Sequence, residues 1–245
     1  MKLGIIGAGK VGCACALTAV NRGTAREIVL VNRTRKTAAA VATDTRYGLP
    51  LSPRADIRDG DYADLAGCGV VMITSGINEK TGGATDRNDS EGRLKLLDKN
   101  AAIYRDIVPR IVKASPEAVL LVVTDPPDPL ADVARKAAGH TRVLSAGTYL
   151  DSQRFRVHLA RHFDVDPATV EAQVLGEHGT SQIFAWSTAR IGGVPVADLL
   201  KRRGEDAKRC TRHSRKTCAT PTSPSSRATT PASTASPSSP AASPR

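Results

Sequence analysis

A glycine pattern near the start of the chain limits the folds open to it more than any other feature. The apolar run 3–6 leads into GAGKVG, where Gly7, Gly9 and Gly12 are spaced G-x-G-x-x-G, and an alanine-rich segment follows. Between a strand and a helix, these glycines allow a tight turn, close approach of a phosphate to the backbone, and tight helix–strand packing. The pattern predicts that the helix N-terminus, with Lys10 and Val11, binds the pyrophosphate of a dinucleotide rather than forming a purely structural turn.

Apolar runs alternate with helical patterns along most of the chain. We expect strands at 3–6, 27–32, 55–57, 69–76, 118–124 and 142–147, and helices to about residue 21 and over 35–48, 93–113 (with a kink at Pro109) and 125–139. Several of these strands are continuous apolar runs, which is typical of parallel strands covered on both faces. The sequence therefore predicts an α/β fold with a Rossmann-type, doubly wound parallel sheet over residues 1–145.

The end of the second expected strand bears on the choice of cofactor. An acid that binds the ribose hydroxyls normally stands about 20 residues after the glycines, but Asn32 stands here, followed by Arg33, Thr34 and Arg35. An asparagine with two arginines would accept the 2′-phosphate of NADP, which an aspartate would repel. Alternatively, the arginines simply begin a solvated helix, so the residues leave NAD and NADP both open.

The net charge of +11 comes mainly from the C-terminal segment. Seven of the 35 basic residues and none of the 24 acidic ones lie between Lys208 and Arg245. The rest lacks a basic patch interleaved with aromatic residues, so we expect no nucleic-acid partner. No stretch approaches the ~20 apolar residues that cross a bilayer, and no secretory leader is evident. Five cysteines without framework spacing fit a reducing compartment, and Cys13 and Cys15 point to different helix faces, which argues against a metal pair. We expect a cytoplasmic protein without a membrane partner.

A histidine in VLGEHGTSQ (174–182) raises a different possibility. A lone loop histidine such as His178 is usually a solvated residue. However, YLDSQRFR (149–156), LGEHGTS (175–181) and EGRLKLLDKN (91–100) follow the glycine pattern in a fixed order. With these motifs, residues 1–207 resemble the L-lactate/malate dehydrogenase family. The resemblance implies hydride transfer between a nicotinamide cofactor and a small L-2-hydroxy acid, with lactate/pyruvate first and malate/oxaloacetate or a bulkier acid as alternatives.

The resemblance also implies a role for each matching residue. His178 matches the family's catalytic base, Asp151 the carboxylate that orients it, Arg154 the fork that binds the substrate carboxylate, and Arg93 the loop arginine that polarises the carbonyl. Thr74, Gly76 and Thr124, at the ends of expected strands, match cofactor-contacting positions. Taken singly, Arg154 could be a surface ion-pair partner and Asp151 a helix cap.

Three features depart from the family pattern. Asp125 stands before Pro126 where the family usually has a substrate-contacting asparagine, and an ionised carboxylate cannot donate a hydrogen bond as an amide does. Thr180 stands where the family usually has an acid, and the loop 77–92 is longer than usual. These departures leave the substrate open.

The segment 208–245 has a composition unlike the rest of the chain. It contains no large aliphatic or aromatic residue and is rich in Pro, Ser, Thr and Ala, so we expect a disordered tail. A basic linker is one explanation, and we favour a one-nucleotide frameshift after Ala207. Residues 146–207 would then be an incomplete α+β substrate domain, which leaves an inactive fragment as an alternative function and puts the family's homo-oligomeric assembly in doubt.

Overall fold

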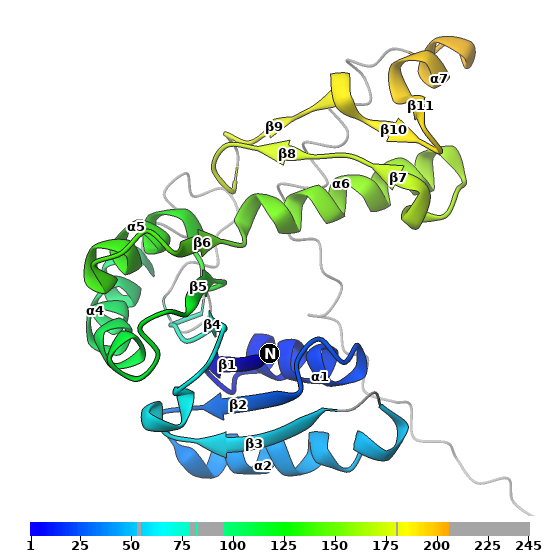
Figure 1. Ribbon diagram of the computed structural model, residues 1–245. Coiled ribbons are helices and arrows are strands. Elements are labelled where there is room, and N and C mark those ends of the chain that lie inside the picture. Colours follow the sequence, from blue (N-terminus) through cyan, green and yellow to red (C-terminus); the bar gives the residue numbers. More distant parts are fainter. Residues whose placement is uncertain (53–54, 79–81, 83–95, 180, 206–245) are drawn as a thin grey trace, which may run out of the picture.

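Six parallel strands form the main sheet of the computed structural model, which describes residues 1–52, 55–78, 82, 96–179 and 181–205 (Figure 1). The strands are β1 (Lys2–Ile6), β2 (Glu27–Val31), β3 (Asp56–Gly60), β4 (Val70–Ile73), β5 (Val119–Val122) and β6 (Val143–Ser145), in the order β3-β2-β1-β4-β5-β6. This is the strand order of a doubly wound dinucleotide-binding sheet. The order in which strands are added to the sheet reverses between β1 and β4. The predicted α/β fold is confirmed.

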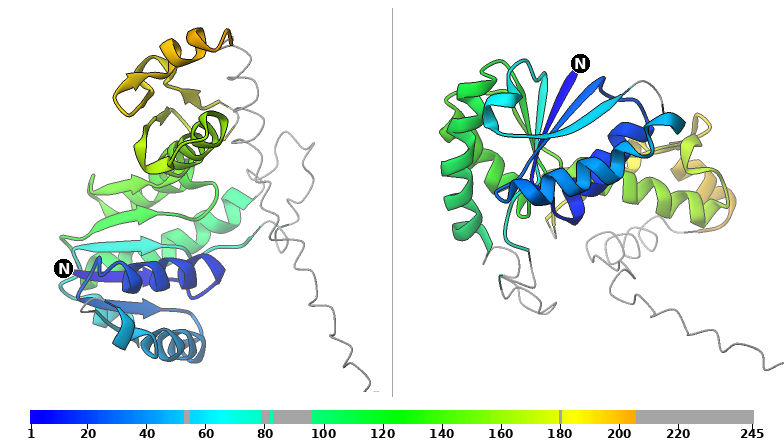
Figure 2. Two further views of the ribbon diagram at one scale, coloured as in Figure 1. Left: turned by 90° about the vertical axis from the view of Figure 1, so that its right-hand side faces the viewer. Right: turned by 90° about the horizontal axis from the view of Figure 1, so that it is seen from below.

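Four helices cover the two faces of this sheet (Figure 2). They are α1 (Lys10–Asn21), α2 (Arg35–Arg46), α4 (Leu97–Ala114) and α5 (Pro127–Ala138). Successive strand side chains point to opposite faces, so Leu3 and Ile5 of β1 pack in the core with α1 and α2, whereas Ile6 packs in the core with α4 and α5. Both faces are buried, as the continuous apolar strands predicted.

Some element boundaries differ from those expected. β3 runs on to Gly60, and β6 ends at Ser145 because Gly147 already begins the next helix. Helix α4 is continuous through Pro109. Pro109 and Arg105 both lie on its exposed side, where water can satisfy the carbonyl that loses its N–H partner. The expected start of this helix at 93–95 lies outside the described residues.

A smaller α+β part follows β6 (Figure 1). It consists of α6 (Gly147–Phe163), β7 (Val170–Glu171), β8 (Val174–Leu175), β9 (Ile183–Phe184), β10 (Arg190–Ile191), β11 (Val194–Pro195) and α7 (Val196–Arg202). Its strands pair antiparallel, in the orders β11-β10-β7 and β8-β9. Phe155 of α6 meets Phe184 and Trp186 edge-to-face, with ring centroids 4.9 Å apart in each pair. This part therefore has an aromatic core of its own.

Short 3₁₀ turns complete the described structure, at η1 (Leu49–Leu51), η2 (Tyr62–Leu65), η4 (Pro167–Thr169) and η5 (Trp186–Thr188). Within the described ranges, no helix combines the length and the apolar content needed to cross a lipid bilayer. The predicted disordered tail 208–245 lies outside the described residues.

Candidate active site

The glycine loop joins β1 to α1 at the point in the sheet where the strand order reverses. Gly7 has a φ of +111°, a conformation that favours glycine. A Cβ on Gly12 would lie 1.8 Å from the Gly7 carbonyl oxygen, so only glycine allows this approach of helix and turn. Thr74, at the end of β4, donates from its hydroxyl to the Ile6 and Gly7 carbonyls at 3.1 Å each. Thr74 therefore fixes the loop against the sheet.

The same loop leaves room for a phosphate. A Cβ on Gly9 would meet no atom within 4 Å. Helix α1 has no side-chain cap and no acidic residue in its first turn, so its N–H groups and positive dipole end face this space. Lys10 and Val11 are exposed beside it. The residues present thus fit the pyrophosphate of a dinucleotide.

Asn32 contacts this loop from the end of β2. Its side-chain oxygen accepts from the Ala8 N–H at 3.1 Å, and its amide nitrogen donates to the Thr34 carbonyl at 3.1 Å. Arg33 is exposed. Arg35 instead binds two carboxylates, donating to Asp59 at 2.8 Å and to Asp61 at 2.6 Å. The two arginines expected to act together on a 2′-phosphate therefore have different surroundings.

The ends of β4 and β5 are tied together by a buried side chain whose role the sequence did not reveal. Asn100 of α4 is fully buried and accepts from the Ile77 N–H at 2.7 Å. Its amide donates to the Asp125 carbonyl at 2.8 Å and to the Ile77 carbonyl at 3.3 Å. A Cβ on Gly76 would lie 2.2 Å from Thr124 Cγ2, and the Thr124 hydroxyl donates to the Ser75 carbonyl at 2.8 Å. The predicted cofactor contacts of Gly76 and Thr124 thus fall in a closely packed edge.

His178 and Asp151 are brought together from distant parts of the smaller unit. His178 lies in the turn after β8, and its side chain is 8% exposed. Its Nδ1 is 2.5 Å from Oδ2 of Asp151, which is fully buried on α6. The second oxygen of Asp151 accepts from Arg154 at 3.1 Å. His178 is therefore no solvated loop residue, and Asp151 is buried with a partner on each oxygen.

Arg154 forms an ion pair, as its alternative interpretation as an ion-pair partner predicted. The partner, however, is a residue of the candidate site. The Asp151 carboxylate is its partner three residues earlier on α6, and the Arg154 side chain is 32% exposed. A guanidinium has five N–H donors in a planar fork. Arg154 can therefore contact Asp151 with one arm and a substrate carboxylate with others.

Two further acids and a glycine surround His178. Asp125 Oδ1 lies 3.8 Å from Nε2 of His178. Asp128, in the first turn of α5, accepts from the His178 backbone N–H at 2.7 Å. A Cβ on Gly147 would lie 2.6 Å from the His178 Cβ. The sequence analysis missed Asp128 and Gly147, although Asp128 lies only three residues beyond the departure at Asp125.

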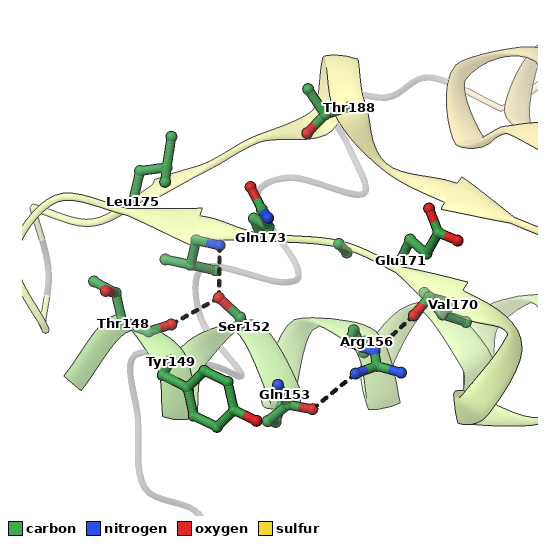
Figure 3. A pocket seen from close by; sticks show the side chains of 12 residues that line it. Thr148, Tyr149, Ser152, Gln153, Arg156, Val170, Glu171, Gln173, Leu175 and Thr188 are labelled. Carbon is green, nitrogen blue, oxygen red and sulfur yellow. Dashed lines mark hydrogen bonds between the residues drawn. The ribbon is translucent and has the colours of Figure 1, made fainter. Parts of the chain in front are cut away.

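Several predicted features cannot be placed. Arg93, Thr180 and nearly all of the long loop 77–92 lie outside the described residues. A cavity of about 630 Å³ lies elsewhere, between α6 and β7–β8 (Figure 3). Ser152 and Arg156 line it, on the side of α6 facing away from Asp151 and Arg154. This cavity is therefore distinct from the His178 cluster.

The cysteines of the described part carry no evident chemistry. Cys68 is buried, Cys13 and Cys15 are half-buried, and burial raises the pKa of the Cys15 and Cys68 thiols. The described residues contain no group of three or more His, Cys, Asp or Glu side chains placed to hold a metal ion.

Comparison with known proteins places this geometry in a family. Residues 1–144 match the lactate/malate dehydrogenase NAD binding domain, and residues 148–214 match the lactate/malate dehydrogenase alpha/beta C-terminal domain. The chain is 44% identical over 206 residues to an L-lactate dehydrogenase of Thermus aquaticus and 43% identical over 201 residues to one of Deinococcus radiodurans. These alignments cover 83% and 82% of this chain, and 64% of each relative. The chain thus spans less than two thirds of the length of these curated relatives.

Solved structures agree. A lactate dehydrogenase from a Medee basin deep-sea metagenome library superposes with a TM-score of 0.78 at 34% identity. The malate dehydrogenase of Cryptosporidium parvum gives the same TM-score at 28% identity. Each match covers 89% of this chain and 68% of the other. The chain belongs to the lactate/malate dehydrogenase family.

Proposed function

We propose that this protein derives from, and carries the site of, a nicotinamide-dependent L-2-hydroxy-acid dehydrogenase. The observation that carries the proposal is the buried contact between His178 Nδ1 and Asp151 Oδ2 at 2.5 Å. Because a carboxylate accepts at Nδ1, the neutral ring has no proton on Nε2. Nε2 is therefore the atom that takes the hydroxyl proton of a 2-hydroxy acid, and Asp151 stabilises the imidazolium that results.

Arg154 and Arg93 serve the substrate in this proposal. Arg154 is held beside His178 through Asp151, so a 2-hydroxy acid whose carboxylate is bound by its fork has its hydroxyl near Nε2. Arg93 polarises the carbonyl of the 2-oxo acid. L-lactate/pyruvate is the first choice because the relatives above are named L-lactate dehydrogenase. Malate/oxaloacetate is the alternative, supported by the malate dehydrogenase structure, and a bulkier acid is a third.

NAD is the proposed cofactor, with NADP as the alternative. The match to an NAD binding domain supports the former, and the open space at Gly9 accommodates the pyrophosphate. When bound, its nicotinamide ring supplies the carbon that accepts the hydride. Gly7, Gly12 and Thr74 shape the loop, Lys10 and Val11 flank it, Asn32 and Arg33 border the ribose, and Gly76 and Thr124 border the nicotinamide end.

The two parts of the chain, each with its own hydrophobic core, have different roles in this proposal. Residues 1–145 bind the cofactor, and residues 146–207 form part of a substrate-binding unit that relatives complete with a further third of their length. The segment 208–245, which lies outside the described residues, is then an out-of-frame tail. We infer a cytoplasmic enzyme by descent that acts on a small 2-hydroxy or 2-oxo acid, with homo-oligomeric assembly open. The alternative is an inactive dinucleotide-binding fragment, since the chain covers only 64% of the length of the L-lactate dehydrogenase relatives.

The test compares the 245-residue chain with a version extended by the C-terminal third of a relative. Reduction of pyruvate and of oxaloacetate is followed with NADH and with NADPH. We expect clear turnover of pyruvate by the extended version and far less by the 245-residue chain. If neither 2-oxo acid is reduced by the extended version, the proposed reaction is wrong. Equal turnover by the two versions would show that the added third is dispensable.

A further inference from the structure

An arginine and two acids form a cluster beside the end of β2. In the sheet, Leu30 pairs with Asp59 and Val31 pairs with Gly60, so Asp59 and Asp61 lie next to the end of β2, which Asn32 follows. Arg35, at the first position of α2, donates to Asp59 at 2.8 Å and to Asp61 at 2.6 Å. Three charged groups from α2 and the end of β3 therefore lie where the sheet edge meets the proposed ribose site.

The charges of this cluster do not favour a phosphate. Arg35 contributes one positive charge, and its two partners contribute two negative ones. The hydrogen bond that Arg35 donates to Asp59 and the negative charge of Asp61 raise the pKa of Arg35, so it stays a cation. Asp64 does not change the balance, because it pairs with Arg58 at 2.9 Å. Arg33, next to Asn32, is a cation with no hydrogen bond or ion pair to any residue in the described part of the chain.

Asn32 adds no charge and is itself engaged. Both polar atoms of its side chain make backbone contacts, with Ala8 and with Thr34. It therefore holds the glycine loop in place and does not supply the negative charge that an aspartate would add at this position. Discrimination against a 2′-phosphate therefore has to come from residues other than Asn32.

We propose that Asp59 and Asp61 are the residues that make this chain prefer NAD over NADP, by keeping Arg35 from a 2′-phosphate and by repelling that dianion. The proposal rests on the proposed function, since it requires the dinucleotide to lie along this edge. An exposed ion pair contributes little to stability. The effect on the ligand is electrostatic, however, and acts within a Debye length of about 8 Å at physiological salt. The preference should therefore weaken as salt concentration rises.

Calorimetric titration of the full 245-residue chain with NAD and with NADP tests the proposal. Four forms are compared: the unmodified chain, Asp59→Asn with Asp61→Asn, Arg35→Ala, and all three substitutions together. Asparagine at 61 keeps the side-chain oxygen that caps η2, so this turn should be retained. Asp56→Asn is the control, because it removes one negative charge by the same type of substitution at the exposed other end of β3.

We expect the double asparagine variant to bind NADP at least roughly tenfold more tightly, with NAD affinity changed by less than about twofold. Arg35→Ala should have little effect alone and should abolish the gain in the double variant. Asp56→Asn should leave both affinities unchanged. An NADP affinity that does not rise in the double variant, while NAD still binds, overturns the inference. Absence of binding of either cofactor to any form would instead overturn the proposed function.

Discussion

Asp125 Oδ1 lies 3.8 Å from Nε2 of His178, across the imidazole ring from the nitrogen that Asp151 contacts. The ring is thus flanked by a buried carboxylate on one side and a 40% exposed carboxylate on the other. In the proposed function, the substrate oxygen approaches Nε2 on the side where this second carboxylate lies. Where an amide would donate to that oxygen, an ionised carboxylate repels it.

Replacing Asp125 by asparagine should therefore improve substrate binding. We expect the Asp125→Asn variant, in the presence of reduced cofactor, to bind pyruvate roughly tenfold more tightly, or about 1.4 kcal/mol. Calorimetry measures the change. Asp44→Asn on the exposed side of α2 is the control, since it removes the same charge away from the site. Unchanged or weaker pyruvate binding by Asp125→Asn would mean that this carboxylate does not face the substrate.

Substitution of His178 should separate chemistry from cofactor binding. In a version extended to the relatives' length, His178→Asn should abolish turnover and leave NAD affinity nearly unchanged, because the imidazole acts on the substrate proton. Arg154→Lys should mainly raise KM, since an ammonium cannot reproduce the two-pronged contact. Steady-state kinetics and cofactor titration measure both. Near-normal kcat in His178→Asn would show that the base lies elsewhere.

Two alanine substitutions in the glycine loop should differ in their effect on stability. Gly9→Ala adds a methyl group in open space at a φ of −78°, so stability should hold. The methyl should still weaken NAD binding by at least about tenfold, because it occupies the approach of the pyrophosphate. Gly12→Ala places its methyl 1.8 Å from the Gly7 carbonyl oxygen and should destabilise the fold. Denaturant unfolding and NAD titration distinguish them, and unaltered NAD affinity in Gly9→Ala would contradict the proposed phosphate position.

Loss of the Asn100 side chain should destabilise the sheet edge. Asn100→Ala leaves the half-buried Ile77 N–H and Asp125 carbonyl without this partner. We expect a cost of about 3 kcal/mol in the free energy of unfolding. Asn21→Ala is the comparison, because Asn21 is exposed and accepts only one long bond from Ser52, at 3.5 Å. A difference between the two variants below about 1 kcal/mol would contradict the role given to Asn100.

Local patterns predicted the sheet well because they act over short distances. The turn at Gly7, Gly9 and Gly12 and the apolar strands β1 and β5 depend on residues close together in the chain. Each can therefore be predicted directly from the local sequence. The family resemblance added His178 and Asp151, which lie 27 residues apart and form a contact that no local pattern contains. Their catalytic roles stay predictions.

The features that escaped prediction are contacts between segments distant in the chain. Asp128 and His178 are 50 residues apart, and Arg35 and Asp61 are 26 apart. No periodicity or composition links such pairs, because each forms only when folding brings two distant segments of the chain together. Arg35 shows the consequence. The sequence suggested that it could bind a phosphate, whereas in the fold it binds two carboxylates.

The aromatic cluster of the smaller unit also allows unfolding of that unit to be followed separately by fluorescence. Trp186 is the single tryptophan of the chain, and its ring packs against Phe155. The six-stranded sheet therefore contributes no indole fluorescence. A red shift of the emission maximum would mark opening of the α6–α7 unit, while circular dichroism in the far ultraviolet still reports the parallel sheet and its helices. The protein thus carries an intrinsic optical probe confined to the segment that holds His178.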